Sequence, residues 1–408
     1  MTSRAERMFE IVLDELKQKP LQEQRTEICE RKGLGHPDTI CDAIADEISR
    51  ELSKEYMKRF GAVMHHNTDK SLLVAGDVEV AFGGGKVLKP MLLVIGDRAT
   101  FTVGDETIPV EEIALKASKE WVKKNLRLVD PEEHLRYQVE LKRGSQALAD
   151  IFARKDRFLG ANDTSAAVGF APMTATEQVV RNVEFYLNGP SFKSDFPETG
   201  EDVKVMGLRK DDELHLTVGM AFVDGYINSE PEYFRLKEEV LQEIKEYVGP
   251  RVQFKVSVDL NTADMPGRGI AGMYLTVLGT SADGGDCGQV GRGNRVNGII
   301  PLNRPTCSEA ACGKNPVSHV GKIYNILTYR MAEEVYRKVP GIKEVYVWLL
   351  SQIGKPINEP KVVSAQLVLE PNTRMKEVED PVREAIQAEL DGLDVFCKEL
   401  IEGKVKLC

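Results

Sequence analysis

The sequence predicts an α+β protein with three related α/β domains, each a mixed or antiparallel sheet packed with helices. Three times along the chain, a pair of strand patterns is followed by a helix pattern. Such repetition indicates related units, and strands that follow strands argue against one doubly wound parallel sheet. We expect approximate, interleaved units at residues 1–130, 131–255 and 256–408. Chance recurrence of a common order stays an alternative, because the units share no residue-level identity.

Each element follows from the spacing of its apolar residues. Alternation or an unbroken apolar run predicts a strand, and recurrence every three to four residues predicts a helix. The expected strands are Thr26–Arg31, Ser71–Phe82, Met91–Val103, Val203–Leu208, Glu213–Val223, Glu344–Leu350 and Val362–Leu369. The expected helices are residues 8–17, Pro37–Phe60, Pro109–Leu126, Pro231–Val248, a segment that begins at Val320, and Val378–Ile401.

The composition is that of an ordinary globular protein with an acidic balance. The chain has 408 residues, a formal net charge of −10, and 42% hydrophobic and 29% charged residues. A nucleic-acid or membrane-surface binder would need a basic surface, so neither is expected as a partner. Any anion site must therefore be a local basic pocket.

The cysteine pattern and the absence of long apolar runs indicate a cytoplasmic protein. Seven cysteines are scattered without the spacing of zinc ligands, and reduced thiols are the simplest account of them. We see no signal-peptide pattern and no apolar run of ~18 residues, so no membrane span is expected.

The loop Glu30–Thr39 places two glycines and a proline around His36 and Asp38, directly before a strong helix pattern. Pro37 suits the first helical position, because its missing N–H would be unpaired there. The free N–H groups and the dipole of a helix N-terminus favour anions. We therefore expect His36 and Asp38 to face a polyanion, Asp38 through a metal ion. The alternative is a loop whose glycines only serve the turn.

Three later segments combine glycine with cations and carboxylates: Gly284–Asp286, Gly291–Arg295 and Gly313–Lys322. They match neither the P-loop nor the dinucleotide fingerprint. If these loops converge with the first one, they form a pocket for several phosphates with carboxylate ligands for Mg²⁺. The cations would be Arg292, Lys314, Lys322, His36 and His319, and the metal ligands would be Asp38 and Asp286. Each residue could instead be a solvated loop charge, a helix cap or part of a surface turn.

These motifs resemble those of one enzyme family, S-adenosylmethionine synthetase (methionine adenosyltransferase). The matching stretches are Gly35-His36-Pro37-Asp38-x-Ile40-x-Asp42, Gly284-Gly285-Asp286-x-Gly288-x-x-Gly291-Arg292 and Gly313-Lys314-Asn315-Pro316. The whole chain resembles the archaeal-type branch. The resemblance implies three pseudo-symmetric α/β domains and a homodimer with active sites at the subunit interface.

The resemblance also implies a reaction between ATP and L-methionine. The methionine sulfur attacks C5′ of ATP, and the tripolyphosphate leaves and is hydrolysed to pyrophosphate and phosphate. A neutral thioether needs no general base, so the lack of a Ser–His or Cys–His pair does not argue against this reaction. Mg²⁺ is the implied cofactor, and K⁺ is a further candidate for which we assign no residues.

By motif, four residues would act on the phosphate chain and the metal. His36 would contact the triphosphate near the oxygen that bridges to C5′, and Asp38 would bind Mg²⁺. Arg292 and Lys314 would hold the phosphates.

Other residues would contact the remaining parts of the substrates. Asp163 would hold the adenosine and Asp286 the methionine, while Lys204 matches a substrate-binding lysine through a weaker alignment. Gly144 and Ser145 resemble a mobile segment near the site. Ala147 replaces an acidic residue that is usual in the archaeal-type branch, so contact there would be made by the backbone.

The chain departs from the bacterial and eukaryotic pattern at three positions. Thr39 and Ser318 stand where a lysine is usual, and Val320 stands where an aspartate is usual. One metal carboxylate and one phosphate-binding lysine are therefore unassigned, and His319 and Lys322 are the candidate replacements.

Two other functions remain open at this stage. An ATP-dependent kinase or ligase could use the same phosphate pocket, and a non-catalytic nucleotide-binding subunit could retain the fold. The retained His36, Asp38, Arg292 and Lys314 argue against the second.

Overall fold

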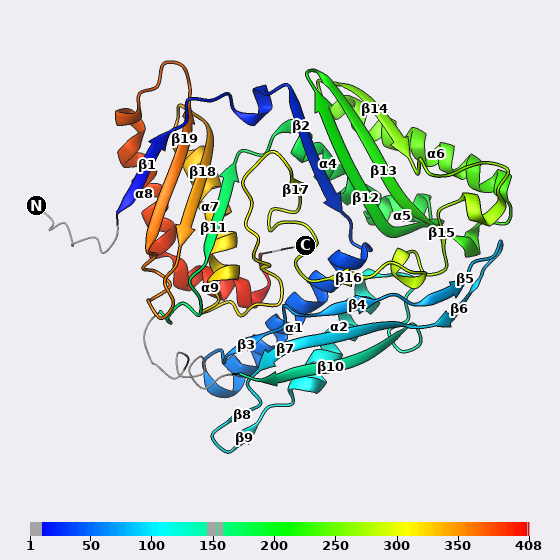
Figure 1. Cartoon of the computed structure of the whole chain (residues 1–408), viewed down its shortest axis with the longest axis horizontal. Helices are drawn as coiled ribbons and strands as arrows, with labels where there is room; N and C mark the ends of the chain where they lie inside the picture. The colour runs from blue at the N-terminus through cyan, green and yellow to red at the C-terminus, as the bar shows by residue number, and fades with distance from the viewer. Residues whose placement is uncertain (1–9, 145–151, 153–157, 406, 408) are drawn as a thin grey trace, which may run out of the picture.

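The computed structural model describes residues 10–144, 152, 158–405 and 407. Within these residues the chain forms three larger sheets and two short hairpins, with helices packed against the larger sheets. In Figure 1 the three sheets face the viewer and most helices lie behind them. The sheets contain both parallel and antiparallel pairs, so the expected α+β class with mixed sheets packed by helices is confirmed.

The strands of each larger sheet come from distant parts of the chain. The first sheet has the order β14 (Lys255–Leu260), β13 (Glu213–Val223), β12 (Thr199–Lys210), β2 (Thr26–Lys32), β17 (Ile300–Pro301), with β15 (Leu275–Thr276) beside β13. The second has the order β10 (Leu135–Arg143), β7 (Met91–Ala99), β4 (Leu72–Val74), β16 (Gly288–Gln289), with β3 (His66–Asn67) beside β7. The third has the order β1 (Ile11–Glu15), β19 (Val362–Leu369), β18 (Ile342–Leu350), β11 (Ala166–Ala171). The hairpins are β5 (Asp77–Glu79) with β6 (Lys86–Lys89), and β8 (Thr102–Val103) with β9 (Glu106–Thr107).

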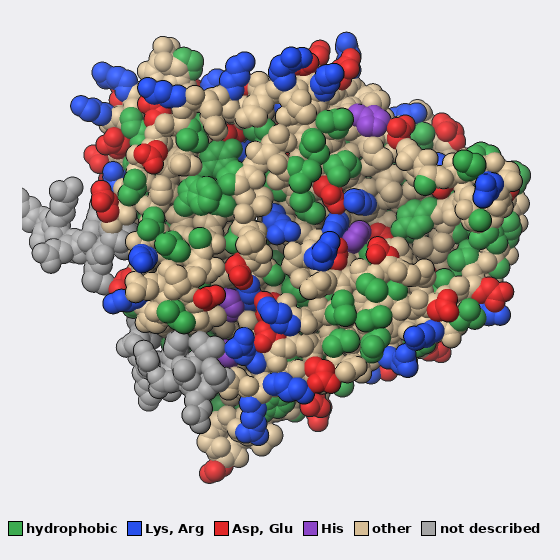
Figure 2. All heavy atoms as spheres, viewed as in Figure 1, with side chains coloured by type: hydrophobic (Ala, Val, Ile, Leu, Met, Phe, Trp, Pro, Cys, Tyr) green, Lys and Arg blue, Asp and Glu red, His purple; other side chains and the backbone are tan. Residues whose placement is uncertain are grey.

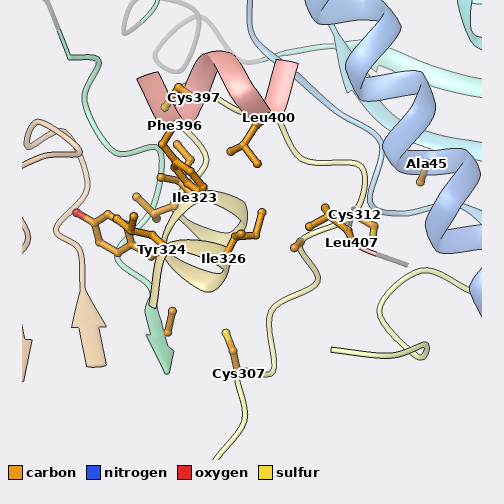
Figure 3. Packing of buried hydrophobic residues seen from close by; sticks show 14 of the residues in the cluster. Ala45, Cys307, Cys312, Ile323, Tyr324, Ile326, Phe396, Cys397, Leu400 and Leu407 are labelled. Carbon is orange, nitrogen blue, oxygen red and sulfur yellow. The ribbon is translucent and has the colours of Figure 1, made fainter. Parts of the chain in front are cut away.

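The helices cover one face of each sheet. Their bounds are α1 (Pro37–Phe60), α2 (Val110–Asn125), α4 (Ala175–Leu187), α5 (Pro190–Asp195), α6 (Glu230–Val248), α7 (Val320–Lys338), α8 (Met375–Asp391) and α9 (Leu393–Glu402). The first sheet contacts α4 and α6, the second α1 and α2, and the third α7 and α8. One apolar cluster continues from the second sheet to the third, where Ile323 of α7 packs near Phe396 of α9 (Figure 3). A separate cluster lies behind the first sheet.

Several expectations about local structure need correction. The expected strands Ser71–Phe82 and Met91–Val103 are each divided, because β4 and β7 lie in the second sheet whereas β5 and β8 lie in the hairpins. Residues 8–17 do not form a helix, because Ile11–Glu15 pair in parallel with β19, and there Ile11 is buried while Val12 is 42% exposed. The expected helix Val378–Ile401 is two helices, which meet at Gly392. Helix α4 was not expected, although its capping box of Thr174 and Glu177 is a readable signal.

Helix α1 organises the centre of the molecule. It begins directly after the loop that follows β2 of the first sheet and then runs behind the second sheet (Figure 1). It contacts α2, β4, β16 and α9, so its first turns lie where several parts of the chain meet. Among the described helices, none is both long enough and apolar enough to span a bilayer.

Candidate active site

The loop from Gly33 to His36 lies flat against strand β12. Gly33 N donates to Val203 O at 2.6 Å, and Gly35 N donates to Glu201 O at 2.9 Å. A Cβ at Gly33 or Gly35 would overlap the backbone of Val203 or Glu201. The two glycines are therefore required for this close approach, which fixes the start of α1 against the first sheet.

His36 is the N-cap residue of α1, and it is held as a neutral donor. Its Nδ1 accepts a hydrogen bond from Asp38 N at 3.2 Å, so the ring proton is on Nε2. Burial lowers the pKa of His36 below 6.5, although the charges of Asp202 and Asp38 raise it. The side chain is 13% exposed. His36 can therefore offer an Nε2–H donor to a ligand at neutral pH.

Asp38 lies in the first turn of α1 and is buried. Its Oδ1 accepts from Gln289 N at 2.9 Å, and its Oδ2 accepts from Lys32 Nζ at 2.8 Å. Lys32 Nζ also donates to Arg292 O at 2.7 Å, and Thr39 Oγ1 donates to Lys32 O at 3.2 Å. Lys32 thus places a cation beside Asp38, a role that the sequence motifs did not reveal.

Asp42, one turn further along α1, binds the same glycine-rich loop. Its Oδ1 accepts from Gly291 N at 2.8 Å, and burial raises the pKa of Asp42 to about 7. A Cβ at Gly288 would overlap Pro37 O, and one at Gly293 would overlap the Asp42 carboxylate. The loop 288–293 therefore lies directly on the first two turns of α1, which brings the segment with Arg292 to the segment with His36.

A group of acids lies beside His36. Asp202 is buried and accepts from Ser281 Oγ at 2.6 Å, Ser281 N at 2.9 Å and Tyr274 OH at 3.3 Å. Burial raises the pKa of Asp202, and its hydrogen bonds from Ser281 and Tyr274 lower it. Asp286 Oδ2 accepts from the same Ser281 Oγ at 3.4 Å. The predicted residue Asp286 thus joins His36 in one site, together with Asp202, which the sequence reasoning missed.

Lys314 is the centre of a second, cationic cluster. It is 2% exposed, and its Nζ lies 3.6 Å from Asp69 Oδ2 and also contacts Glu309. Ser49 Oγ of α1 donates to Lys314 O at 2.8 Å, which fixes the backbone of this loop against the helix. A Cβ at Gly321 would lie 3.1 Å from Lys314 Nζ. The lysine therefore lies next to the start of α7.

His319 and Lys322 complete this cluster, as the shared motif predicted. His319 is the N-cap of α7, and its Nδ1 accepts from Gly321 N at 3.3 Å. Burial and the charge of Lys314 hold the pKa of His319 well below 6.5. Lys322 Nζ forms a 2.6 Å ion pair with Asp46 Oδ1 of α1.

Helix α1 connects the two clusters through three aspartates. Asp38, Asp42 and Asp46 are four residues apart, so they follow one face of the helix. Asp38 and Asp42 hold the glycine-rich loop, and Asp46 holds Lys322. At 1.5 Å per residue, the first and last aspartates are about 12 Å apart along the helix axis.

Lys204 and Arg292 lie at the edge of the first cluster. Lys204 is directly opposite Lys32 in the β12–β2 pairing, and its Nζ lies 3.1 Å from Glu30 Oε1. Its side chain is 46% exposed. The side chain of Arg292 is also exposed and has no hydrogen bond or ion pair to any residue that the structure describes. Both cations are therefore available to a ligand.

Within the part of the chain that the structure describes, Asp163 and Gly144 form no hydrogen bond or ion pair with the predicted residues of either cluster. The Asp163 carboxylate is exposed and accepts only from Thr164 N, but the preceding Asn162 Oδ1 accepts from Val320 N at 3.3 Å among the described residues. The Asp163 segment therefore adjoins the start of α7. Gly144 lies against the His65 ring, which a Cβ would contact. Ser145 and Ala147 lie outside the described residues.

The three residues that differ from the bacterial and eukaryotic pattern have structural roles. Thr39 donates to the backbone of Lys32, Ser318 Oγ donates to Gly160 O at 2.8 Å, and Val320 is buried. No described group of three or more His, Cys, Asp or Glu side chains could hold a metal ion by itself. Asp38 nevertheless fits Mg²⁺, because this ion commonly takes one or two carboxylates and completes its shell with water and substrate phosphates.

Comparison with known proteins shows which family this chain resembles. The family model of S-adenosylmethionine synthetase (AdoMet synthetase) matches residues 9–404. The chain is 47% identical to the S-adenosylmethionine synthase of Pyrococcus abyssi, over 97% of this chain and 99% of that protein. It is 46% identical to that of Archaeoglobus fulgidus, over 98% and 100%.

A solved structure described as an unusual S-adenosylmethionine synthetase from Campylobacter jejuni has a similar fold. The TM-score is 0.58 at 16% identity, over 93% of both chains. At this identity the likeness concerns the fold alone, whereas the family model and the archaeal relatives cover nearly the whole sequence. The chain therefore belongs to the S-adenosylmethionine synthetase family.

Proposed function

We propose that this protein synthesises S-adenosylmethionine from ATP and L-methionine. The methionine sulfur attacks C5′ of ATP, the tripolyphosphate leaves, and it is then hydrolysed to pyrophosphate and phosphate. The observation that carries this proposal is the arrangement along α1. One helix face joins a histidine donor and carboxylates at the start of α1 to a buried lysine cluster beside its middle turns.

The leaving group determines which residues accelerate the reaction. Negative charge develops on the oxygen that departs from C5′, and a preorganised donor stabilises it best. His36 would donate from Nε2 to this oxygen, because its Nδ1 already accepts from the backbone. Arg292, Lys204, Lys314 and Lys322 would hold the phosphates. The buried Lys314 exchanges the carboxylate of Glu309 for a phosphate oxygen in this proposal.

Mg²⁺ would be held at Asp38, beside Lys32. The bound ion neutralises phosphate charge and orients the leaving group. Asp38 keeps acceptor capacity on both oxygens beyond the bonds to Gln289 N and Lys32 Nζ. K⁺ stays a prediction without assigned residues.

The acids beside His36 suit the other substrate. The sulfur becomes a sulfonium ion as the new bond forms, and a nearby carboxylate stabilises its positive charge. Asp286 and the buried Asp202 would supply this field, while Asp163 would bind the adenosine. Gly144 would belong to the segment near the site that the family resemblance implies.

A homodimer would complete the site. Figure 2 shows Lys, Arg, Asp, Glu and His side chains gathered in the middle of the face that the three sheets present, with hydrophobic side chains around them. Apolar residues on this sheet face include Val12, Val362, Leu208 and Leu72, which are 38–42% exposed. A cleft of about 840 Å³ lies elsewhere, next to Met173 and Arg304, and no predicted site residue lines it. We therefore propose that a second copy covers the open sheet faces.

Product analysis tests the activity. The protein with ATP, Mg²⁺ and methionine should yield S-adenosylmethionine with equal amounts of orthophosphate and pyrophosphate. ADP without a sulfonium product would instead indicate a kinase, and AMP would indicate a ligase. A dimer that is well folded and makes no S-adenosylmethionine would favour a non-catalytic nucleotide-binding role.

Sedimentation equilibrium tests the assembly. We expect a mass of twice 45.5 kDa. A monomer that is fully active would contradict the proposed interface.

Reduced thiols and a cytoplasmic location are also proposed, since among the described cysteines the structure contains free thiols at six positions.

A further inference from the structure

The chain reverses direction sharply after its last helix. Gly403, the C-cap of α9, has a φ of +71°, a conformation that favours glycine. A Cβ at this position would overlap the guanidinium of Arg50 on α1. Lys404 N donates to Glu399 O at 3.0 Å, which closes the turn. The turn directs the following residues back towards α1 and the loops of the site.

Leu407 is buried. Its side chain is 7% exposed and belongs to the large apolar cluster, and Val405 packs against the same cluster. Figure 3 shows Leu407 beside Cys312, between α7 and the α1 residue Ala45.

Leu407 lies where the two site loops meet. It lines a cavity of about 20 Å³ together with Gly291 and Arg295 from one loop, and Glu309 and Cys312 from the other. Asp42 of α1 lines the same cavity. A space of this size holds about one water molecule, so the leucine fills most of the junction.

The residues around this junction are direct neighbours of the proposed phosphate ligands. Gly291 precedes Arg292 and is held by Asp42, and Glu309 forms an ion pair with Lys314. The polar links between the loops include the bond from Arg295 Nη1 to Cys307 O at 3.3 Å. The glycine-rich loop has few side chains of its own to pack, so an apolar group from elsewhere must fill the gap.

We propose that Leu407 is a positioning residue that holds the Gly288–Arg295 and Glu309–Lys314 loops against α1. This rests on the proposed function, in which these loops present Arg292 and Lys314 to the phosphate chain. Removal of the Leu407 side chain leaves a larger void at the junction and lets both loops shift. A displacement of ~1 Å in a phosphate-binding site can cost up to about 10²-fold in rate.

The test compares Leu407→Ala with Leu407→Met and with Val395→Ala. Leu407→Met conserves volume, and Val395 is a control on α9 that is 54% exposed. We expect Leu407→Ala to raise KM for ATP about 10-fold, with a smaller change in kcat per folded molecule. Leu407→Met and Val395→Ala should match the wild type. A merely structural role would lower the amount of folded protein or its Tm and leave KM unchanged.

Hydrogen exchange of the ligand-free protein supplies a readout that does not need activity. Amides of residues 288–295 and 309–314 should exchange faster in Leu407→Ala, while those in β12 keep their rates. Unchanged exchange in both loops together with an unchanged KM would overturn the inference. If Leu407→Ala fails to fold, Leu407→Val takes its place in both measurements. A wild type that makes no S-adenosylmethionine would refute the proposed function, and the exchange result would still decide the role of Leu407.

Discussion

Helices α1 and α7 begin with the same kind of cap. In each, a histidine precedes the helix, and its Nδ1 accepts the N–H of the residue two positions later. Burial lowers the pKa of both His36 and His319, so both rings are neutral at pH 7. The neutral caps orient the two helix starts without adding charge of their own.

The surroundings of the two caps differ in their balance of charge. Around His36, the carboxylates of Asp38, Asp202 and Asp286 raise the pKa of the ring, and Lys32 lowers it. Around His319, Lys314, Lys322 and Lys70 lower the pKa of the ring, and Asp69 raises it. In the proposed function, the same local motif faces a metal ion and a sulfonium at the start of α1, and part of the phosphate chain at the start of α7. We infer that the charged neighbours from distant segments determine which ligand each site binds. The histidine cap only fixes the orientation of the helix start.

The largest effect should come from the cap that touches the reacting oxygen. We expect His36→Ala to reduce kcat by about 10²-fold or more, because a donor to the developing charge is lost. His36→Asn should keep the N-cap and the Tm but should not restore the rate. Steady-state kinetics and calorimetry measure the two effects. A fully active His36→Asn would show that His36 only caps the helix.

A substitution of Lys314 tests whether the second cluster binds the phosphate chain. Lys314→Met should raise KM for ATP and the inhibition constant of tripolyphosphate by about 10- to 10²-fold, since a hydrogen bond to a charged group contributes ~1.5–3 kcal/mol. Lys116→Met on α2 is the control, because Lys116 is 75% exposed. Equal phosphate affinity in both variants would contradict the assignment.

Substitutions of Asp38 and Asp46 test whether the metal ion binds only at the start of α1. Asp38→Asn should raise the Mg²⁺ concentration for half-maximal activity by about 10-fold or more. Asp46→Asn, two turns along the same helix face, should leave the Mg²⁺ dependence unchanged and weaken only ATP binding through Lys322. Titration of activity with Mg²⁺ measures both. The same Mg²⁺ dependence in Asp38→Asn and wild type would remove Asp38 from the metal site.

The smallest effect is a pH dependence of stability. The unfolded chain protonates His319 near pH 6.5, whereas the folded protein does not, because the folded pKa is well below that value. The unfolded state then binds more protons, so stability is present above pH 6.5 and is lost as the pH falls below it. The slope is up to about 1.4 kcal/mol per pH unit. Urea unfolding should show a weaker pH dependence for His319→Asn than for wild type, and equal slopes would contradict this.

Local patterns predicted much of the fold and the start of α1, which carries His36 and Asp38. The Pro37 start and Gly61 cap predicted α1 to its last residue, because these signals are local. The segment 8–17 was misassigned because its partner is β19, more than 300 residues away in sequence. Periodicity in an isolated window carries no information about such a partner.

The contacts of the site also depend on segments that are distant in sequence. The motifs named His36, Asp38, Asp286 and Lys314, and the structure brings the first three together and places Lys314 beside the middle of α1. Lys32, Asp42 and Asp202 were missed, since their roles arise only when β2, the glycine-rich loop and β12 meet. Asp42 and Asp46 follow Asp38 at spacings of four, which is the signal that could have identified them. The three-domain division and the individual roles stay predictions.

The spacing of the aspartates on α1 limits how this protein can vary in length. One residue inserted between Asp38 and Asp46 would rotate everything beyond it by about 100° and turn Asp46 away from Lys322. An insertion near Gly61, where a Cβ would meet no neighbour, would disturb neither loop. The first turns of α1 thus fix the spacing between the Gly288–Arg295 loop and Lys322, and on this helix a change of length would leave that spacing intact only beyond Asp46.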